Sequence, residues 1–202
     1  MSLFRKLEAS LAISIIVCIV FSVISFANTS AQIRKDVLRL HVIANSDSSV
    51  DQNLKIAVRD AILSQGSEIF DGTVTVENAV ARITPQIDKL SEIAYEVIKE
   101  HGFNYSVKIS IDEEYFETRT YENVTLPAGK YLSLIVKIGS GEGKNWWCVM
   151  FPPMCVSAAD EESTLKTVLN QQEIDLVTKK PKFEPRFKII EIYENVKNKF
   201  FA

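Results

Sequence analysis

The pattern of hydrophobic and polar positions opens with one long apolar segment. Residues 11–27 read LAISIIVCIVFSVISFA without a charge, and Arg5 and Lys6 precede them. A basic flank, an apolar stretch and small residues at its end are typical of a secretory signal peptide, here cleaved after Ala27. The stretch is also close to the ~20 residues that cross a bilayer, so an uncleaved anchor is the alternative. Residues 1–30 are therefore predicted to deliver the rest of the chain across a membrane.

A buried strand followed by an amphipathic helix comes next. Residues 37–44 (VLRLHVIA) are largely apolar and rich in β-branched side chains, which predicts a buried strand. Turn-forming residues follow at 45–49, and Ser49 with Gln52 matches a capping box. Apolar residues then recur at spacings of three and four as far as Gly66 or the Asp71-Gly72 pair, which predicts a helix with one apolar stripe.

A second helical pattern begins near Thr75 and continues for more than twenty residues. Pro85 lies inside it and predicts a kink or break, because proline removes a helix hydrogen bond and clashes with the preceding turn. His101-Gly102 is typical of a helix C-terminus, where a cation-capable side chain is favourable.

The period then changes to two, which predicts strands. Four of them are expected, over 105–111, 115–121, 130–138 and 145–151, with a turn at 112–114 joining the first two. The glycine-rich segment 139–143 is expected to form a hairpin loop between the last two.

The C-terminal part is predicted to be helical at both ends. A helix is expected over 160–170, and the polar segment Gln171–Pro185 is expected to be a loop. A final amphipathic helix is expected over Arg186–Phe200, with a buried face made of Ile189, Ile192, Tyr193, Val196 and Phe200.

This order of elements predicts an α+β fold. Strands and helices are segregated along the chain, which favours an antiparallel sheet of about four to five strands with helices packed on one face. The signal or anchor helix precedes it. Residues 31–202 are thus expected to form a single exported α+β domain, a size that one hydrophobic core can support.

The charge balance argues against one class of partner, and the cysteines suggest a disulfide. The chain has 23 basic and 26 acidic residues without a basic block, which argues against nucleic acid as a partner. Outside the cytosol, Cys148 and Cys155 could form a disulfide, since a turn centred on Phe151-Pro152 would place them opposite each other on paired strands. Two small buried thiols are the alternative.

Few residues suggest catalysis. Ser46, His41 and Asp47 could be written as a triad, but neighbours along a strand point to opposite faces and no GxSxG motif is present. The segment GSGEGK matches neither the GxxxxGK[ST] nor the GxGxxG spacing of nucleotide-binding loops. The cysteines lack nearby histidines for a zinc site. We therefore predict no catalytic residue, cofactor or metal.

Adjacent aromatic residues suggest an interaction surface instead. Trp146 and Trp147 point to opposite faces of a strand, so either one is exposed or both faces of the sheet are covered. Pro152 and Pro153 follow closely, and exposed aromatic residues beside prolines are favoured at protein interfaces.

Two blocks of the sequence resemble the stage II sporulation protein R family. They are RLHVIANSD at Arg39–Asp47 and GKNWWCVMFPPMC at Gly143–Cys155. The resemblance implies a protein made in the forespore and exported into the space between forespore and mother cell. There it would activate a membrane-embedded aspartic protease, which removes the pro-sequence of a mother-cell sigma factor, so the chain itself would not be an enzyme.

The residues predicted to contact the partner lie in these two blocks: His41, Asn45, Asp47, Trp146, Trp147, Pro152 and Pro153. Two other classes of function stay open as alternatives. One is an extracytoplasmic hydrolase built around His41, and the other is a membrane-tethered structural protein that keeps its N-terminal segment.

Overall fold

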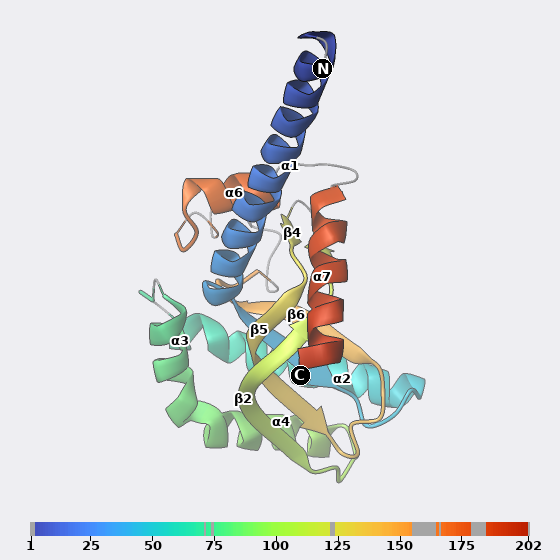
Figure 1. The fold of residues 1–202 in the computed structure, drawn as a ribbon. Helices are drawn as coiled ribbons and strands as arrows, with labels where there is room; N and C mark the ends of the chain where they lie inside the picture. Colours follow the sequence, from blue (N-terminus) through green and yellow to red (C-terminus); the bar gives the residue numbers. More distant parts are fainter. Residues whose placement is uncertain are drawn as a thin grey trace.

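The computed structural model describes residues 3–70, 72–73, 75–121, 124–154, 165, 167–178 and 185–201 (Figure 1). A long N-terminal helix leads into a body of sheets and helices. The helices are α1 (Leu3–Lys35), α2 (Ser49–Ile69), α3 (Val76–Ile83), the short 3₁₀ helix η1 (Thr84–Gln86), α4 (Ile87–Glu100), α6 (Gln171–Thr178) and α7 (Pro185–Phe201). The strands are β1 (Leu38–Ile43), β2 (Val107–Phe116), β3 (Arg119–Tyr121), β4 (Val124–Leu126), β5 (Gly129–Ile138) and β6 (Asn145–Phe151).

The N-terminal helix α1 has an exposed half and a buried half. Most of its apolar side chains up to Ile24 are exposed, and by length and composition it is the helix of the described residues that could cross a membrane. Further along, Phe26, Ser30 and Ile33 are buried against the body. The helix runs without interruption past Ala27, the predicted cleavage position. Signal peptide and anchor both agree with its apolar composition.

The main sheet has four strands in the order β2-β5-β1-β6 (Figure 1). Strands β2 and β5 are antiparallel, as are β1 and β6, but β1 and β5 are parallel. A parallel neighbour requires a long crossover connection, and here the chain between β1 and β5 contains the helices α2 to α4 and the strands β2 to β4. The predicted α+β class is confirmed; the sheet is mixed because the early strand β1 inserts between β5 and β6. A separate two-stranded sheet pairs β3 with β4.

One face of the main sheet packs against α2, α3 and α4. Leu40 and Val42 of β1 meet Leu134 and Val136 of β5 there, and Val58 of α2 closes the core above them. Alternation along each strand directs these residues to one side. The predicted amphipathic stripe of α2 is the helical part of this core.

The opposite face is covered as well, contrary to the prediction of helices on one face only. Ile33 from the end of α1, Val124 from β4 and Ile174 from α6 pack there with Val149 of β6. Covering both faces explains how adjacent residues on β1 and β6 can both be buried. The segment Gln171–Pro185, predicted as a loop, begins with the helix α6.

Three local predictions can be compared with the described elements. The break at Pro85 is confirmed, since η1 separates α3 from α4 there. The turn at 112–114 is wrong, because β2 continues through these residues and pairs with β5 along its whole length. The helix predicted over 160–170 lies mostly outside the described residues.

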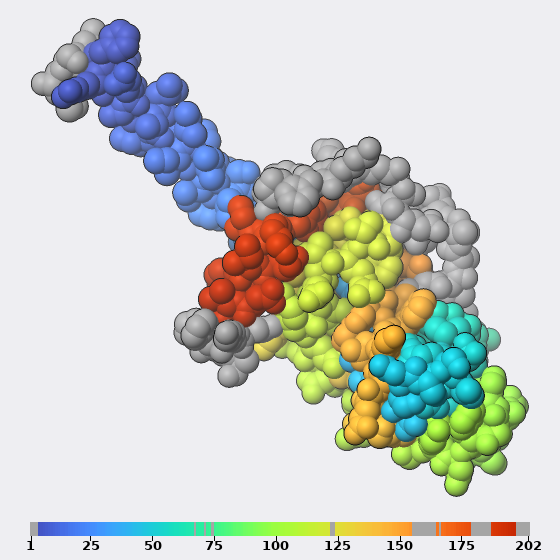
Figure 2. Space-filling view, turned by 90° about the vertical axis from the view of Figure 1, so that its right-hand side faces the viewer, coloured from blue at the N-terminus to red at the C-terminus, as the bar shows by residue number. Residues whose placement is uncertain are grey.

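The last helix, α7, buries a different face from the one that was predicted. Phe187, Ile190 and Glu194 form its buried face, whereas Ile189, Ile192, Tyr193 and Val196 are exposed. Figure 2 shows α7 in red on the face of the molecule turned to the viewer. The side chain of Phe200 lies outside the described residues.

Candidate partner-binding site

The two sequence blocks Arg39–Asp47 and Gly143–Cys155 meet at the carboxyl end of β1. The loop of residues 44–48 lies there against the loop of residues 139–144, and we call these two segments the distal loops. Their backbones are joined by hydrogen bonds from Gly143 N to Ala44 O (2.9 Å) and from Glu142 N to Asn45 O (3.3 Å). The glycine-rich segment thus crosses the end of β1 on its way from β5 to β6, and it is not the hairpin loop that we predicted, because β1 lies between these strands.

Asn45 and Asp47 hold the distal loops together. Asn45 Oδ1 accepts a hydrogen bond from the backbone N–H of Ser140 (3.0 Å), and Asp47 Oδ1 accepts one from the backbone N–H of Lys144 (2.7 Å). Asn45 is partly buried and Asp47 is exposed. Both predicted partner-binding residues therefore have a structural task in the free protein.

Asp51 is the polar centre of this end of the molecule. Its Oδ2 accepts hydrogen bonds from Ser46 Oγ (2.5 Å) and from Asn45 Nδ2 (3.0 Å), while its backbone N–H donates to the N-cap residue Ser48. The hydrogen bond from Ser46, with that from Asn45, holds the pKa of the Asp51 carboxyl below its ordinary value. The helix N-terminus stabilises the negative charge further.

Lys55 extends the same network from α2 to the second loop. Its Nζ donates to Gln52 Oε1 (2.6 Å) and to Lys144 O (2.9 Å), and its side chain is buried. Burial lowers the pKa of Lys55, since an ammonium group loses its hydration there. The start of α2 is thereby fixed to both distal loops.

Two glycines make the close approach of the loops possible. A Cβ atom on Gly139 would lie 2.2 Å from Asn45 Oδ1, and one on Gly143 would lie 2.3 Å from the backbone O of Ser46. Gly139 also has a φ of +57°, which L-residues with a side chain rarely adopt. Close packing therefore explains Gly139 and Gly143 of GSGEGK without a role in nucleotide binding.

His41 lies on the second face of the sheet and is almost fully buried. Its Nδ1 donates to Glu114 Oε2 (2.6 Å), its Nε2 lies 2.9 Å from Asn145 Oδ1, and its ring stacks on Trp147 with centroids 3.7 Å apart. The residue links β1 to β2 and β6. Nε2 faces the side-chain amide of Asn145, which is not a nucleophile, and this disfavours the hydrolase alternative.

Arg39 is buried two residues earlier on the same face. Its Nε donates to Cys148 O (3.0 Å) and its guanidinium carbon lies 4.2 Å from the centre of the Phe116 ring and 5.0 Å from that of Tyr131. Its Nη2 donates to the Tyr121 hydroxyl (2.5 Å), which ties β3 to the main sheet. Burial lowers the pKa of Arg39. Aromatic ring faces stabilise the buried cation.

The two tryptophans have different environments. Trp147 is partly buried between His41 and Phe116, and it lines a small cavity of about 310 Å³. Trp146 points to the other face and is 36% exposed, with the Arg59 guanidinium 4.3 Å from its ring centre. The prediction that one tryptophan could be exposed thus applies to Trp146. A planar cation stacked on an exposed indole is a favourable surface for protein contact.

The proline pair and the cysteines complete the second block. Pro152 is buried after a cis Phe151-Pro152 peptide bond, and Pro153 is exposed. Cys148 is buried and disulfide-bonded, and Cys18 in α1 is free. Cys155 lies outside the described residues, so its pairing with Cys148 stays a prediction.

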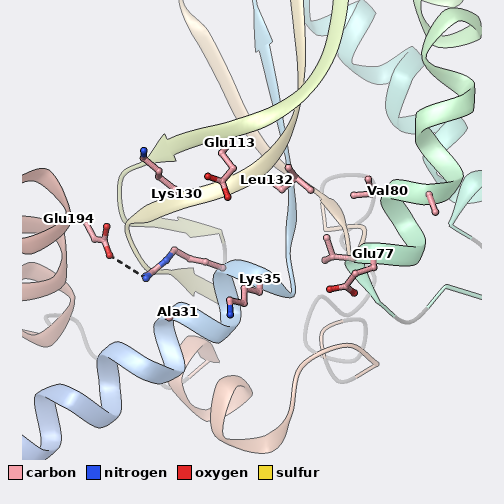
Figure 3. A pocket seen from close by; sticks show the side chains of 11 residues that line it. Ala31, Lys35, Glu77, Val80, Glu113, Lys130, Leu132 and Glu194 are labelled. Carbon is pink, nitrogen blue, oxygen red and sulfur yellow. Dashed lines mark hydrogen bonds and ion pairs between the residues drawn. The ribbon is translucent and has the colours of Figure 1, made fainter. Parts of the chain in front are cut away.

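A separate cavity lies at the base of α1 (Figure 3). It has a volume of about 800 Å³ and is lined by both signs of charge, including Lys35, Lys130 and Glu113. Arg34 and Glu194, which also line it, form an ion pair of 3.3 Å. None of the residues predicted to contact a partner lines this cavity, so it is separate from the distal loops.

The structure brings together most of the predicted residues but gives them different tasks. His41 contacts Trp147, and Asn45 and Asp47 join the loops, whereas Trp146 and Pro153 are exposed. Sequence reasoning missed Arg59, Lys55 and Glu114 as members of the site. Their partners are distant in the sequence, and only the pairing of β1 with both neighbours brings them close.

Comparisons with known proteins agree with the two blocks. The sequence model of the family described as stage II sporulation protein R matches residues 34–161. Stage II sporulation protein R of Bacillus subtilis (strain 168) is 36% identical over 128 residues, which are 63% of this chain and 57% of that protein. The match thus spans somewhat over half of the length of this relative. No solved structure matches the chain.

The matched region begins at the end of α1 and includes β1, the distal loops and β6. It therefore contains the packed elements that hold Asn45, Asp47 and Trp146 in place. Because the family match covers more than half of the sequence, the chain belongs to the stage II sporulation protein R family.

Proposed function

We propose that this protein is an exported signalling protein of sporulation that keeps α1 as a membrane anchor and acts by contact. Its partner would be a membrane-embedded aspartic protease of the mother cell, which processes a pro-sigma factor once it is bound. Family membership supports the role in sporulation. The location between forespore and mother cell and the identity of the protease are parts of the proposal.

The observation that carries this proposal is the separation of two kinds of surface. The exposed apolar half of α1 lies at one end of the molecule. Strand β1 leads away from α1, and at its carboxyl end Trp146 pairs with Val42 next to the distal loops. A strand rises about 3.3 Å per residue, so this end of the six-residue strand projects away from the anchor. Such an arrangement suits contact with a partner in an opposing membrane.

We propose that Trp146 with Arg59 is the contact surface. Trp146 is a large aromatic side chain that remains 36% exposed, and the Arg59 guanidinium stacks on its ring at 4.3 Å. Tryptophan and arginine are the residues that most often dominate protein interfaces. For activation, the surface must bind the active state of the protease more tightly than the inactive state, since only differential affinity shifts such an equilibrium.

Trp146→Ala tests this surface. We expect the variant to be exported and folded but to lose most of its ability to trigger processing of the sigma-factor precursor. Tyr95→Ala is a matched control, because Tyr95 of α4 is an aromatic residue with the same 36% exposure on another part of the surface. Equal processing by wild type and Trp146→Ala would show that the contact surface lies elsewhere.

A further inference from the structure

The helix α6 is buried against the C-terminal end of α1. Ile174 and Val177 of α6 pack there with Ile33 of α1 on the second face of the sheet. Figure 1 shows α6 in orange beside α1 in blue. The same contact contains an acidic side chain, because Glu173 of α6 is only 2% exposed. A carboxyl group at this depth has lost most of its hydration, so its hydrogen-bond partners determine whether it can carry a charge.

One oxygen atom of Glu173 holds the start of α6. Glu173 Oε2 accepts a hydrogen bond from the backbone N–H of Asn170 (2.8 Å). In return, Asn170 Oδ1 accepts hydrogen bonds from the backbone N–H groups of Gln172 (2.9 Å) and Glu173 (3.1 Å). This reciprocal arrangement is a capping box, in which glutamate and glutamine are both suitable at the third helical position. The capping box therefore needs Oε2 but not the negative charge.

The other oxygen atom of Glu173, Oε1, is buried and accepts no hydrogen bond. Its side-chain neighbour is Asp36, the first residue after α1, which acts on Glu173 by charge and by side-chain hydrogen bonding. Gln32 Nε2 donates to both carboxylate oxygens of Asp36, at 3.2 and 3.0 Å. Two ionised carboxylates are both acceptors, so neither can donate to the other. A proton on Glu173 removes this conflict, since Oε1–H can then donate to Asp36.

Asp36 is the charged group that acts on Glu173. The other charged side chains described on the last turn of α1, on α6 and on α7 are Arg34, Lys35, Asp175, Lys188, Glu191 and Glu194. Arg34 pairs with Glu194, Lys188 pairs with Glu191, and strand β4, which also contacts α6, has no charged residue. Burial raises the pKa of the Glu173 carboxyl above its ordinary value, and Asp36 adds to the increase, while hydrogen bonds from Asn170 partly offset it.

We propose that Glu173 and Asp36 share a proton and form a pH-sensitive clasp between α6 and α1. In mild acid, Glu173 is protonated, and its Oε1–H donates to the Asp36 carboxylate and fastens α6. As the pH rises, the proton leaves to solvent, two like charges face each other in a buried contact, and α6 loosens. The sign follows from linkage: the stabilisation is complete below the unfolded pKa of about 4.3 and is lost as pH rises through the higher folded value.

The clasp lies where α1 joins the body. Asp36 stands between the end of α1 at Lys35 and the start of β1 at Leu38. Ile174 of α6 packs on Ile33 of α1 and on Val149 of β6 in the second-face core, so release of α6 uncovers both of these residues. The proton on Glu173 therefore controls how firmly α6 closes the junction between α1 and the sheet.

Hydrogen–deuterium exchange of the full chain in detergent micelles at pH 5 and pH 7.5 tests the clasp, with EDTA present so that a bound cation cannot replace the proton. After correction for the intrinsic pH dependence of exchange, the protection of the α6 amides in the wild type is expected to fall several-fold at pH 7.5. Glu173→Gln keeps the capping box and carries a permanent donor, so its α6 should stay protected at both pH values. Glu92→Gln, at an exposed glutamate of α4, is the matched control and should respond like the wild type.

Asp36→Asn provides a second variant that leaves the capping box untouched. It replaces one of the two carboxylates, so the pH response of α6 should be lost here as well. Equal protection of α6 at both pH values in the wild type, or the same fall in Glu173→Gln as in the wild type, would overturn the clasp. An equal fall in α4 would show a general loosening of the body and would also count against it. No partner is needed, so the result is independent of the proposed function.

Discussion

At the scale of single residues, Asp51 joins the start of α2 to the first of the distal loops. It accepts hydrogen bonds from Ser46 and Asn45, and its own backbone is capped by Ser48. The carboxyl is therefore expected to fix both the start of α2 and the loop that carries the family motif. Its removal should loosen the surface without touching Trp146.

Asp51→Asn should lower the free energy of unfolding at neutral pH by about 1–3 kcal/mol, the usual cost of losing hydrogen bonds to a buried charged group. Because the pKa of Asp51 is depressed in the folded protein, its stabilisation is present above the unfolded pKa of about 3.9 and is lost as pH falls through the folded value. Urea unfolding at pH 7 and pH 3 in detergent should thus show a difference between variant and wild type that shrinks at pH 3. Asp60→Asn, in an exposed ion pair with Arg59, should have a smaller effect at both pH values.

Two glycine-to-alanine substitutions are expected to change the free energy of unfolding in opposite directions. Gly143→Ala should destabilise the protein by about 1–3 kcal/mol, since its Cβ would meet a backbone oxygen at 2.3 Å. Gly66→Ala in α2 should stabilise it by up to about 1 kcal/mol, because its Cβ meets the Phe70 ring at an ordinary 3.6 Å and alanine favours helix. Thermal unfolding of both variants checks the pair. A neutral Gly143→Ala would mean that the distal loops do not pack as described.

At the scale of elements, the packing of α1 bears on whether the N-terminal segment is cleaved or kept as an anchor. Phe26 is only 3% exposed and packs on Phe187, and Ser30 and Ile33 beyond it are fully buried. A signal peptidase needs its cleavage site accessible and extended, whereas here the residues on both sides of Ala27 belong to a helix packed on the body.

We therefore predict that the exported protein keeps its N-terminal segment. Mass spectrometry of the protein recovered from the membrane fraction of a secreting host should give the full-length chain, and Phe26→Asp should increase cleavage by freeing the helix from α7. An exported form that begins at Asn28 would contradict the anchor and favour the signal peptide.

Sequence periodicity predicted the elements better than their orientation. The stripe of α2, the break at Pro85 and the four strands of the main sheet could be read from local patterns, although the bounds of β2 could not. The buried face of α7 was predicted wrongly, because Ile189, Ile192, Tyr193 and Val196 form the more apolar stripe, and yet Phe187, Ile190 and Glu194 face α1. Periodicity identifies an apolar face but not whether the same chain covers it.

The candidate site shows the same limit. The motif residues Asn45 and Trp146 could be selected from the sequence, but their different tasks depend on β1 lying between β5 and β6. That insertion places Ser140 beside Asn45 and Glu114 beside His41, contacts that join residues 95 and 73 positions apart. No local pattern could predict these pairs.

At the scale of the whole molecule, the proposed anchor and the proposed contact surface lie at opposite ends of β1 and its flanking elements. The exposed half of α1 lies at one end, α7 accompanies the helix where it joins the body, and β1 leads from there to the distal loops and Trp146. Arg39 and His41 fix the sheet in between through Tyr121 and Glu114. A rigid connection of this kind suits a protein that transmits a signal by contact.

The most direct test of this account is co-expression in a host that does not sporulate. The chain, the membrane-embedded aspartic protease of sporulation and the sigma-factor precursor would be produced together, and processing of the precursor would be followed on immunoblots with and without the chain. The account predicts processing only when the exported chain is present, and its loss with Trp146→Ala. Processing that is the same without the chain, or absent with it, would contradict the account.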